Sequence, residues 1–144
     1  SNVVYKIGDA DDNEGYLAFI KVLGQQKKHN PFLPKIYGVR FIRSSNGDTT
    51  FVVAMERLTE LERGMGDVCE WFEDELNDDR SWNTSPNAVA KALGVKQVMP
   101  KPLKEALSIL RKARDEGGYC VGWDLLSGNF MMRGKQVVVT DPLS

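Results

Sequence analysis

The stretch YCVGWDLLSGNFMMRGKQVVVTDPLS, residues 119–144, decides the fold. It begins as a loop, forms a short apolar run at Phe130–Met132, turns at Gly134-Lys135 and returns as a Val-rich run. Two β-prone runs separated by a turn that contains Gly predict a β-hairpin. Two carboxylates and one carboxamide flank this hairpin, namely Asp124, Asn129 and Asp141. This arrangement indicates a metal and phosphate site around the hairpin.

Side chains of this kind suit phosphoryl transfer, whose transferred group is highly charged. Catalysis then depends on metal ions that clamp the phosphates, a lysine that holds them and a carboxylate that orients the attacking hydroxyl. Mg²⁺ prefers hard oxygen ligands, which Asp and Asn supply. Protein kinases have an Asp, four intervening residues and an Asn, then a hairpin and a second Asp. In that order, we predict that Asp124 orients the hydroxyl and that Asn129 and Asp141 bind metal.

The start of the chain fits the same pattern independently. Asn2–Ile7 is β-branched and aromatic and predicts a strand that carries Lys6. We predict that Lys6 holds the α- and β-phosphates, as the strand lysine of a kinase does. An acidic stretch then leads into an amphipathic helix that ends at Gly24. Glu14, at the start of this helix, is the candidate partner of Lys6; the alternative is a favourable charge at a helix N-terminus.

A hairpin and a hinge follow the helix in the expected order. The strand-like runs 35–43 and 49–55 are joined by Ser44–Asp48, which is a strong turn signal. The segment 51–58 resembles the strand and hinge whose backbone contacts adenine in kinases. The predicted contacts with the base are Met55, Glu56 and Leu58 in the hinge, with Met131 beneath it as an apolar floor.

The middle of the chain is predicted to be mostly helical. Residues 68–76 place apolar side chains on one side of a helix, and Pro102 begins a second helix that ends at Gly117-Gly118. Residues 77–87 are polar and loop-like, with no role assigned. The pattern as a whole predicts an α+β fold over 1–144, a reduced, two-lobed kinase-like domain. Its small lobe, 1–58, holds an antiparallel sheet, one helix and the hinge, and 59–144 forms an abbreviated large lobe.

Composition limits the possible partners. A chain of 144 residues with a net charge of −1 gives no reason to expect bulk electrostatic binding to nucleic acid or membranes. No apolar run approaches the roughly 18 to 20 residues of a membrane span, so we expect a soluble protein. Cys69 and Cys120 lack CxxC spacing and are expected to be buried, reduced thiols in a cytosolic protein.

Four segments resemble the early serine/threonine protein kinase of T7-like bacteriophages. They are VYKIG at 4–8, Tyr16–Phe19, Ser127–Asn129 and Thr140–Ser144, and the similarity spans nearly the whole chain. The resemblance implies an ATP- and Mg²⁺-dependent enzyme of the infected host's cytoplasm. It also implies transfer of the ATP γ-phosphate to Ser or Thr of host proteins early in infection.

The departures from the kinase pattern leave two alternatives open. Gly122-Trp123 stands where kinases have His-Arg, and Asp141-Pro142-Leu143 where they have Asp-Phe-Gly. The sequence also has no glycine-rich loop before Lys6 and no substrate-binding segment after Asp141. One alternative is a pseudokinase that binds and inhibits a host protein. The other is a small-molecule phosphotransferase of the aminoglycoside-kinase type, for which the acidic substrate pocket is expected in the region 67–79.

Overall fold

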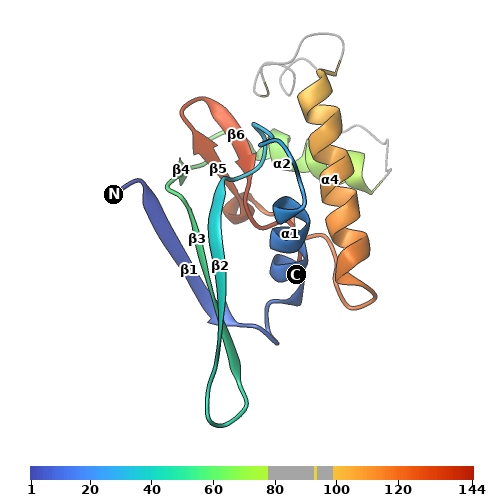
Figure 1. The fold of residues 1–144 in the computed structure, drawn as a ribbon. Coiled ribbons are helices and arrows are strands. Elements are labelled where there is room, and N and C mark those ends of the chain that lie inside the picture. The colour runs from blue at the N-terminus through green and yellow to red at the C-terminus, as the bar shows by residue number, and fades with distance from the viewer. Residues whose placement is uncertain (78–92, 94–98) are drawn as a thin grey trace.

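The fold is α+β, with two small antiparallel sheets and three helices in the part of the chain described. It is given by a computed structural model that describes residues 1–77, 93 and 99–144. The polar loop predicted at 77–87 therefore lies outside the described residues, except for Asn77. Figure 1 shows the larger sheet on one side of the molecule and the helices on the other.

The larger sheet has the strand order β1-β3-β2, with all neighbours antiparallel. Its strands are β1 (Val3–Asp9), β2 (Ile36–Arg43) and β3 (Thr49–Glu56). All three were predicted, but β1 continues two residues beyond its predicted end at Ile7. Each strand alternates its side chains between two faces. Lys6 lies opposite the buried Val53 and therefore shares its face. Tyr5 and Ile7 point to the other face, where they are exposed.

Helix α1 (Glu14–Gly24) covers the face of this sheet that carries Lys6. Most of the apolar stripe of this helix is buried, with Phe19 and Val22 fully excluded from solvent, whereas Leu23 at its end is half-buried. The helix also lies along α4 (Lys101–Gly117), whose own stripe is buried against it. One hydrophobic cluster therefore joins the sheet, α1 and the C-terminal half of the chain.

The smaller sheet contains the predicted C-terminal hairpin. Its strands are β5 (Phe130–Arg133) and β6 (Gln136–Val139), preceded by a short 3₁₀ helix, η1 (Ser127–Asn129). Gly134 makes the turn with a φ of 60°, a conformation that favours glycine. A third strand, β4 (Thr59–Glu60), pairs with β5 and was not predicted, because two residues are too short to show a period.

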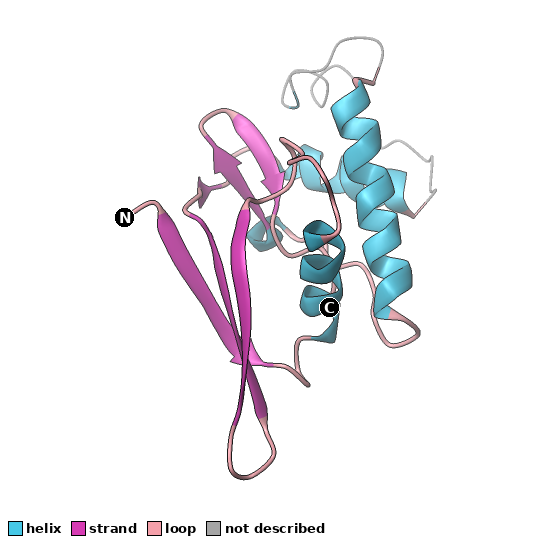
Figure 2. Ribbon diagram, in the orientation of Figure 1, coloured by secondary structure: helices cyan, strands magenta, loops and turns pink. Residues whose placement is uncertain are grey.

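Helix α2 (Gly66–Leu76) packs against this hairpin (Figure 2) and begins two residues before the predicted range. Phe72 contacts Phe130 with their ring centroids 5.5 Å apart, which joins α2 to β5. Cys69 on α2 is buried as predicted, whereas the prediction for Cys120 was wrong: that thiol is exposed, because it follows α4 in a surface turn. None of the described helices is both long and apolar enough to cross a membrane.

Candidate functional site

An ion pair between Lys6 and Asp141 joins the two ends of the chain. Lys6 Nζ lies 2.7 Å from Asp141 Oδ2, although the residues are 135 positions apart. Lys6 comes from the middle of β1, and Asp141 comes directly after the hairpin of β5 and β6. Both side chains keep about a third of their surface exposed, at 34% and 29%. The pair is therefore open to a ligand from solvent, and it brings together two residues that the sequence predicted for one site.

The predicted ion pair between Lys6 and Glu14 is not formed among the described residues. Glu14 is the first residue of α1 and its side chain is exposed. The residue of α1 that meets the lysine is Tyr16, whose ring centroid is 3.6 Å from Lys6 Nζ. The helical turn places Tyr16 on the buried face and Glu14 at its rim, which is why the aromatic residue takes the contact.

The loop that carries Asp124 is tied to the segment around Asp141 by backbone hydrogen bonds. Gly122 and Ser144 exchange two such bonds, at 2.9 and 3.0 Å, and the N–H of Asp124 donates to the carbonyl of Pro142 at 2.8 Å. These are the bonds of a short antiparallel bridge. Asp124 and Asp141 line the same hollow as a result.

Asn129 completes the trio through both its backbone and its side chain. Its Nδ2 donates to the carbonyl of Asp124 at 2.8 Å, and its own carbonyl accepts from the N–H groups of Thr140 and Asp141. The carboxamide is thus held through its nitrogen, and within the described residues no partner occupies its Oδ1. The structure therefore gathers Asp124, Asn129 and Asp141 around one hairpin.

The donor atoms in this cluster fit Mg²⁺. The described residues contain no group of three or more His, Cys, Asp and Glu side chains that could hold a metal by themselves. Mg²⁺ is commonly held by one or two carboxylates together with substrate phosphates and water, so a full protein cage is not required. Asp141 and the carboxamide oxygen of Asn129 supply hard oxygen donors of this kind. They are the residues that would hold the ion.

Gly15 fixes the distance between α1 and the C-terminal segment. A Cβ built on Gly15 would lie 2.8 Å from the backbone carbon of Leu143, so only glycine permits this approach. In Figure 1 the C-terminus accordingly lies beside α1. This contact holds the segment that follows Asp141 against the helix that carries Tyr16.

The predicted adenine contacts lie where the two sheets meet. Met55 and Glu56 end β3, Leu58 is buried, and β4 follows immediately. The N–H of Glu56 donates to the carbonyl of Lys35, but the N–H of Leu58 has no partner within the residues described. Met131, on β5, lines a hollow of about 620 Å³ together with residues 60–66 and 127–128. Leu58 thus offers a free donor, and Met131 an apolar surface, close to the junction.

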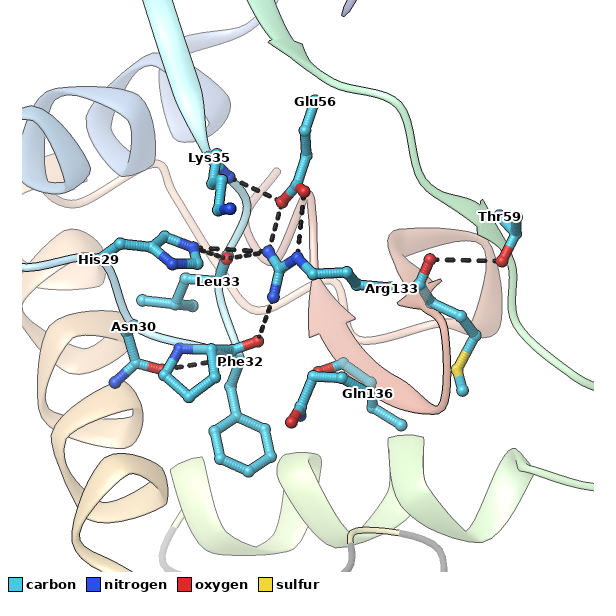
Figure 3. Close-up of polar contacts among 12 residues, drawn as sticks. His29, Asn30, Phe32, Leu33, Lys35, Glu56, Thr59, Arg133 and Gln136 are labelled. Atoms are coloured by element: carbon cyan, nitrogen blue, oxygen red, sulfur yellow. Dashed lines mark hydrogen bonds and ion pairs between the residues drawn. The ribbon is translucent and has the colours of Figure 1, made fainter. Parts of the chain in front are cut away.

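The side chain of Glu56 is occupied by a contact that the sequence did not predict (Figure 3). Arg133, on β5, approaches Glu56 with two nitrogens: Nε donates to Oε2 at 3.0 Å and Nη2 donates to Oε1. Arg133 also donates to the carbonyls of Pro31 and Leu33, at 2.9 and 3.1 Å. This cluster therefore fastens the hinge, the loop after α1 and the C-terminal hairpin together. An arginine at a hairpin turn gives no sequence signal for it.

The acidic stretch at the start of the chain lies at the same site. Asp11, Asp12 and Glu14 line, with Asp124 and Asp141, a hollow of about 260 Å³. We expected an acidic substrate pocket in residues 67–79, and the acids that border the trio come instead from the β1–α1 loop. That loop is carried to the site because β1 ends beside the first turn of α1.

The carboxylate of Glu56 makes the stability of this junction depend on pH. Burial raises the pKa of Glu56, but hydrogen bonds from Arg133 and the N–H of Lys35, with the positive charges of both residues, outweigh it and lower the pKa. A lowered pKa in the folded state stabilises the fold above the ordinary glutamate pKa of about 4.3. This stability is lost as pH falls through the lowered value.

We therefore expect the stability advantage of the wild type over Glu56→Gln to shrink as pH falls below about 4.3. Urea unfolding of both proteins at several pH values between 7 and 3 measures it. The other carboxylates are the same in both proteins, so the difference between their unfolding free energies at each pH isolates the effect of Glu56. A difference that stays constant across this range would contradict the role given to its charge.

No protein-family model matches the chain, and no curated protein sequence matches it significantly.

Proposed function

We propose that the chain is a protein-kinase-like phosphotransferase that binds ATP with Mg²⁺ and transfers the γ-phosphate to Ser or Thr of proteins. The contact between Lys6 and Asp141 carries the proposal. It joins a strand lysine to an acid that follows a hairpin, the two residues that handle phosphates and metal in kinases. The resemblance to the early kinase of T7-like phages extends the proposal to host proteins as acceptors in the host cytoplasm.

The order of the strands supports the proposal further. In the larger sheet, Lys6 lies on β1 next to the central strand β3, which leads directly into the hinge. Helix α1 covers the sheet face that carries Lys6. The N–H of Leu58, which has no hydrogen-bond partner among the described residues, and the side chain of Met131 could contact the edge and the face of a base. Lys6 and Asp141 are available to its phosphates. A kinase-like fold accounts for both sets of groups.

Each residue has a defined task in the proposed reaction. Asp124 orients the hydroxyl of the acceptor and accepts its proton as the hydroxyl attacks the γ-phosphorus. Lys6 would contact the α- and β-phosphates, and Asn129 and Asp141 would hold the metal. Bound Mg²⁺ would supply positive charge to the phosphate oxygens in the transition state. The bond to the γ-phosphate passes from ADP to the acceptor oxygen, and ADP leaves.

Nucleotide binding tests the proposal separately from turnover. Wild-type protein is expected to bind ADP with Mg²⁺ in isothermal titration calorimetry. Lys6→Met should weaken binding about 10- to 100-fold, because a charge-assisted hydrogen bond contributes about 1.5–3 kcal/mol. Lys104→Met, on the exposed side of α4, is the matched control and should bind like the wild type. Failure of the wild type to bind ADP, or equal affinities for both variants, would overturn the proposal.

A small-molecule phosphotransferase is the second candidate, and the acidic hollow favours it. Asp11, Asp12 and Glu14 border the carboxylate of Asp124, where they would attract a cationic acceptor. Competition between an aminoglycoside and a Ser/Thr peptide for labelled phosphate distinguishes the two candidates. Transfer to the aminoglycoside alone would replace the protein acceptor in the proposal.

A further inference from the structure

The ammonium group of Lys6 has two neighbours of opposite character. Asp141 Oδ2 lies 2.7 Å away, and the face of the Tyr16 ring lies 3.6 Å away, measured to its centroid. A cation within about 6 Å of a ring centroid is attracted by the negative face of the π system. Because the two neighbours come from different elements, the removal of one leaves the other in place.

The ring of Tyr16 is itself held rigidly. Only 2% of its surface is exposed, and its ring lies against that of Phe51, with 5.8 Å between the centroids. Its hydroxyl donates to the sulfur of Met55 at 3.9 Å. The close approach of Gly15 to Leu143 fixes the helical turn that carries it. The ring therefore stays under Lys6 whatever the lysine binds.

The phenol also stays neutral at this position. Burial raises the pKa of Tyr16, and the negative charge of Asp141 raises it further. The lysine therefore rests on an uncharged ring rather than on a phenolate. An uncharged partner holds the ammonium without neutralising it, whereas a carboxylate partner would cancel much of its charge.

We propose that Tyr16 is the positioning residue for Lys6 and takes the place that a helix glutamate has in the kinase pattern. This inference rests on the proposed function. If Asp141 bound a metal, the ring would still hold Lys6 in place and leave its full charge for the phosphates. Glu14 then lines the acidic hollow instead of pairing with Lys6.

NMR of the protein without nucleotide tests the contact directly. Protons close above the face of a ring resonate upfield, so the ε-protons of Lys6 should lie upfield of those of the exposed Lys104. The upfield shift should remain in Tyr16→Phe, which keeps the ring, and in Asp141→Asn, which removes the other neighbour. It should vanish in Tyr16→Leu and in Tyr16→Met, which keep apolar volume in two different shapes. A Lys6 signal like that of Lys104 in the wild type would overturn the contact.

ADP titrations test what the contact does. Tyr16→Leu should weaken ADP binding about 3- to 30-fold, the range that a cation–π contact supports, while Tyr16→Phe should stay within about twofold of the wild type. In a Lys6→Met background, Tyr16→Leu should cause no further loss, because its effect passes through the lysine. A merely structural role for Tyr16 predicts the same loss in both backgrounds, which would overturn the proposal.

The two measurements separate this inference from the proposed function. If the wild type binds no ADP, the proposed function fails, and the NMR comparison still decides whether Tyr16 holds Lys6. If ADP binds and the Tyr16 variants match the wild type in both measurements, the positioning role fails alone.

Discussion

An Asp124→Ala variant is expected to lose phosphate transfer by about 100- to 10,000-fold, the range for removal of a group that handles the reacting proton. The measurement is incorporation of label from γ-labelled ATP with Mg²⁺ into proteins of a bacterial extract and into the chain itself. ADP binding should stay close to that of the wild type, because Asp124 is assigned to the acceptor and not to the nucleotide. A loss in rate without a loss in affinity is the expected signature.

The fold should survive this substitution because Asp124 holds its loop through its backbone. Its N–H donates to Pro142 and its carbonyl accepts from Asn129, and alanine retains both groups. No hydrogen bond or ion pair to its carboxylate is found within the described part of the chain. Asp115→Ala, an exposed acid near the end of α4, is the matched control and should transfer phosphate normally. Persistent labelling by purified Asp124→Ala would show that another residue orients the hydroxyl.

Asp141→Asn separates catalysis from a role in binding alone. The asparagine keeps the size of the side chain but loses the negative charge that faces Lys6 and the metal. A kinase should then lose both transfer and Mg²⁺-dependent ADP binding. A pseudokinase that acts by binding a host protein should keep its biological effect. An unchanged effect of this variant on infected or expressing cells would favour the binding role over catalysis.

The order of elements could be predicted from the sequence because each one has a strong local signal. The apolar period of α1, the turn residues at 44–48 and the hairpin glycine at Gly134 are local properties, and all were confirmed. That Lys6 and Asp141 belong to one site was predicted only through the kinase pattern, and their ion pair was not predicted. No local property connects residues 135 positions apart.

The contacts that were missed depend on where the elements come to lie. Spacing along the chain suggested Glu14 for Lys6, but the register of α1 against the sheet selects Tyr16. Arg133 was missed for the same reason, since its partners lie on two other segments, the end of β3 and the loop after α1. The two-residue β4 exists only because β5 is beside it. Such features follow from tertiary packing, to which a single sequence gives little access.

The cluster around Arg133 carries the prediction with the largest effect on stability. The Glu56 side chain is only 10% exposed and that of Arg133 27%, so water can replace little of what either loses. Loss of the guanidinium leaves a buried carboxylate without its partner and the carbonyls of Pro31 and Leu33 without this donor. Removing one partner of a buried ion pair costs about 3–5 kcal/mol, because the remaining charge is uncompensated.

Arg133→Met is therefore expected to lower the free energy of unfolding by about 3 kcal/mol, measured by urea denaturation at pH 7. Lys101→Met is the matched control, because it breaks the exposed pair with Glu105, and it should change stability by less than about 1 kcal/mol. The double variant Glu56→Leu with Arg133→Met should recover much of the loss, since it leaves no buried charge behind. If the double variant instead loses as much unfolding free energy as the two single variants lose together, the two residues act independently. The junction between hinge and hairpin would then depend on the carbonyl contacts of Arg133 rather than on its pairing with Glu56.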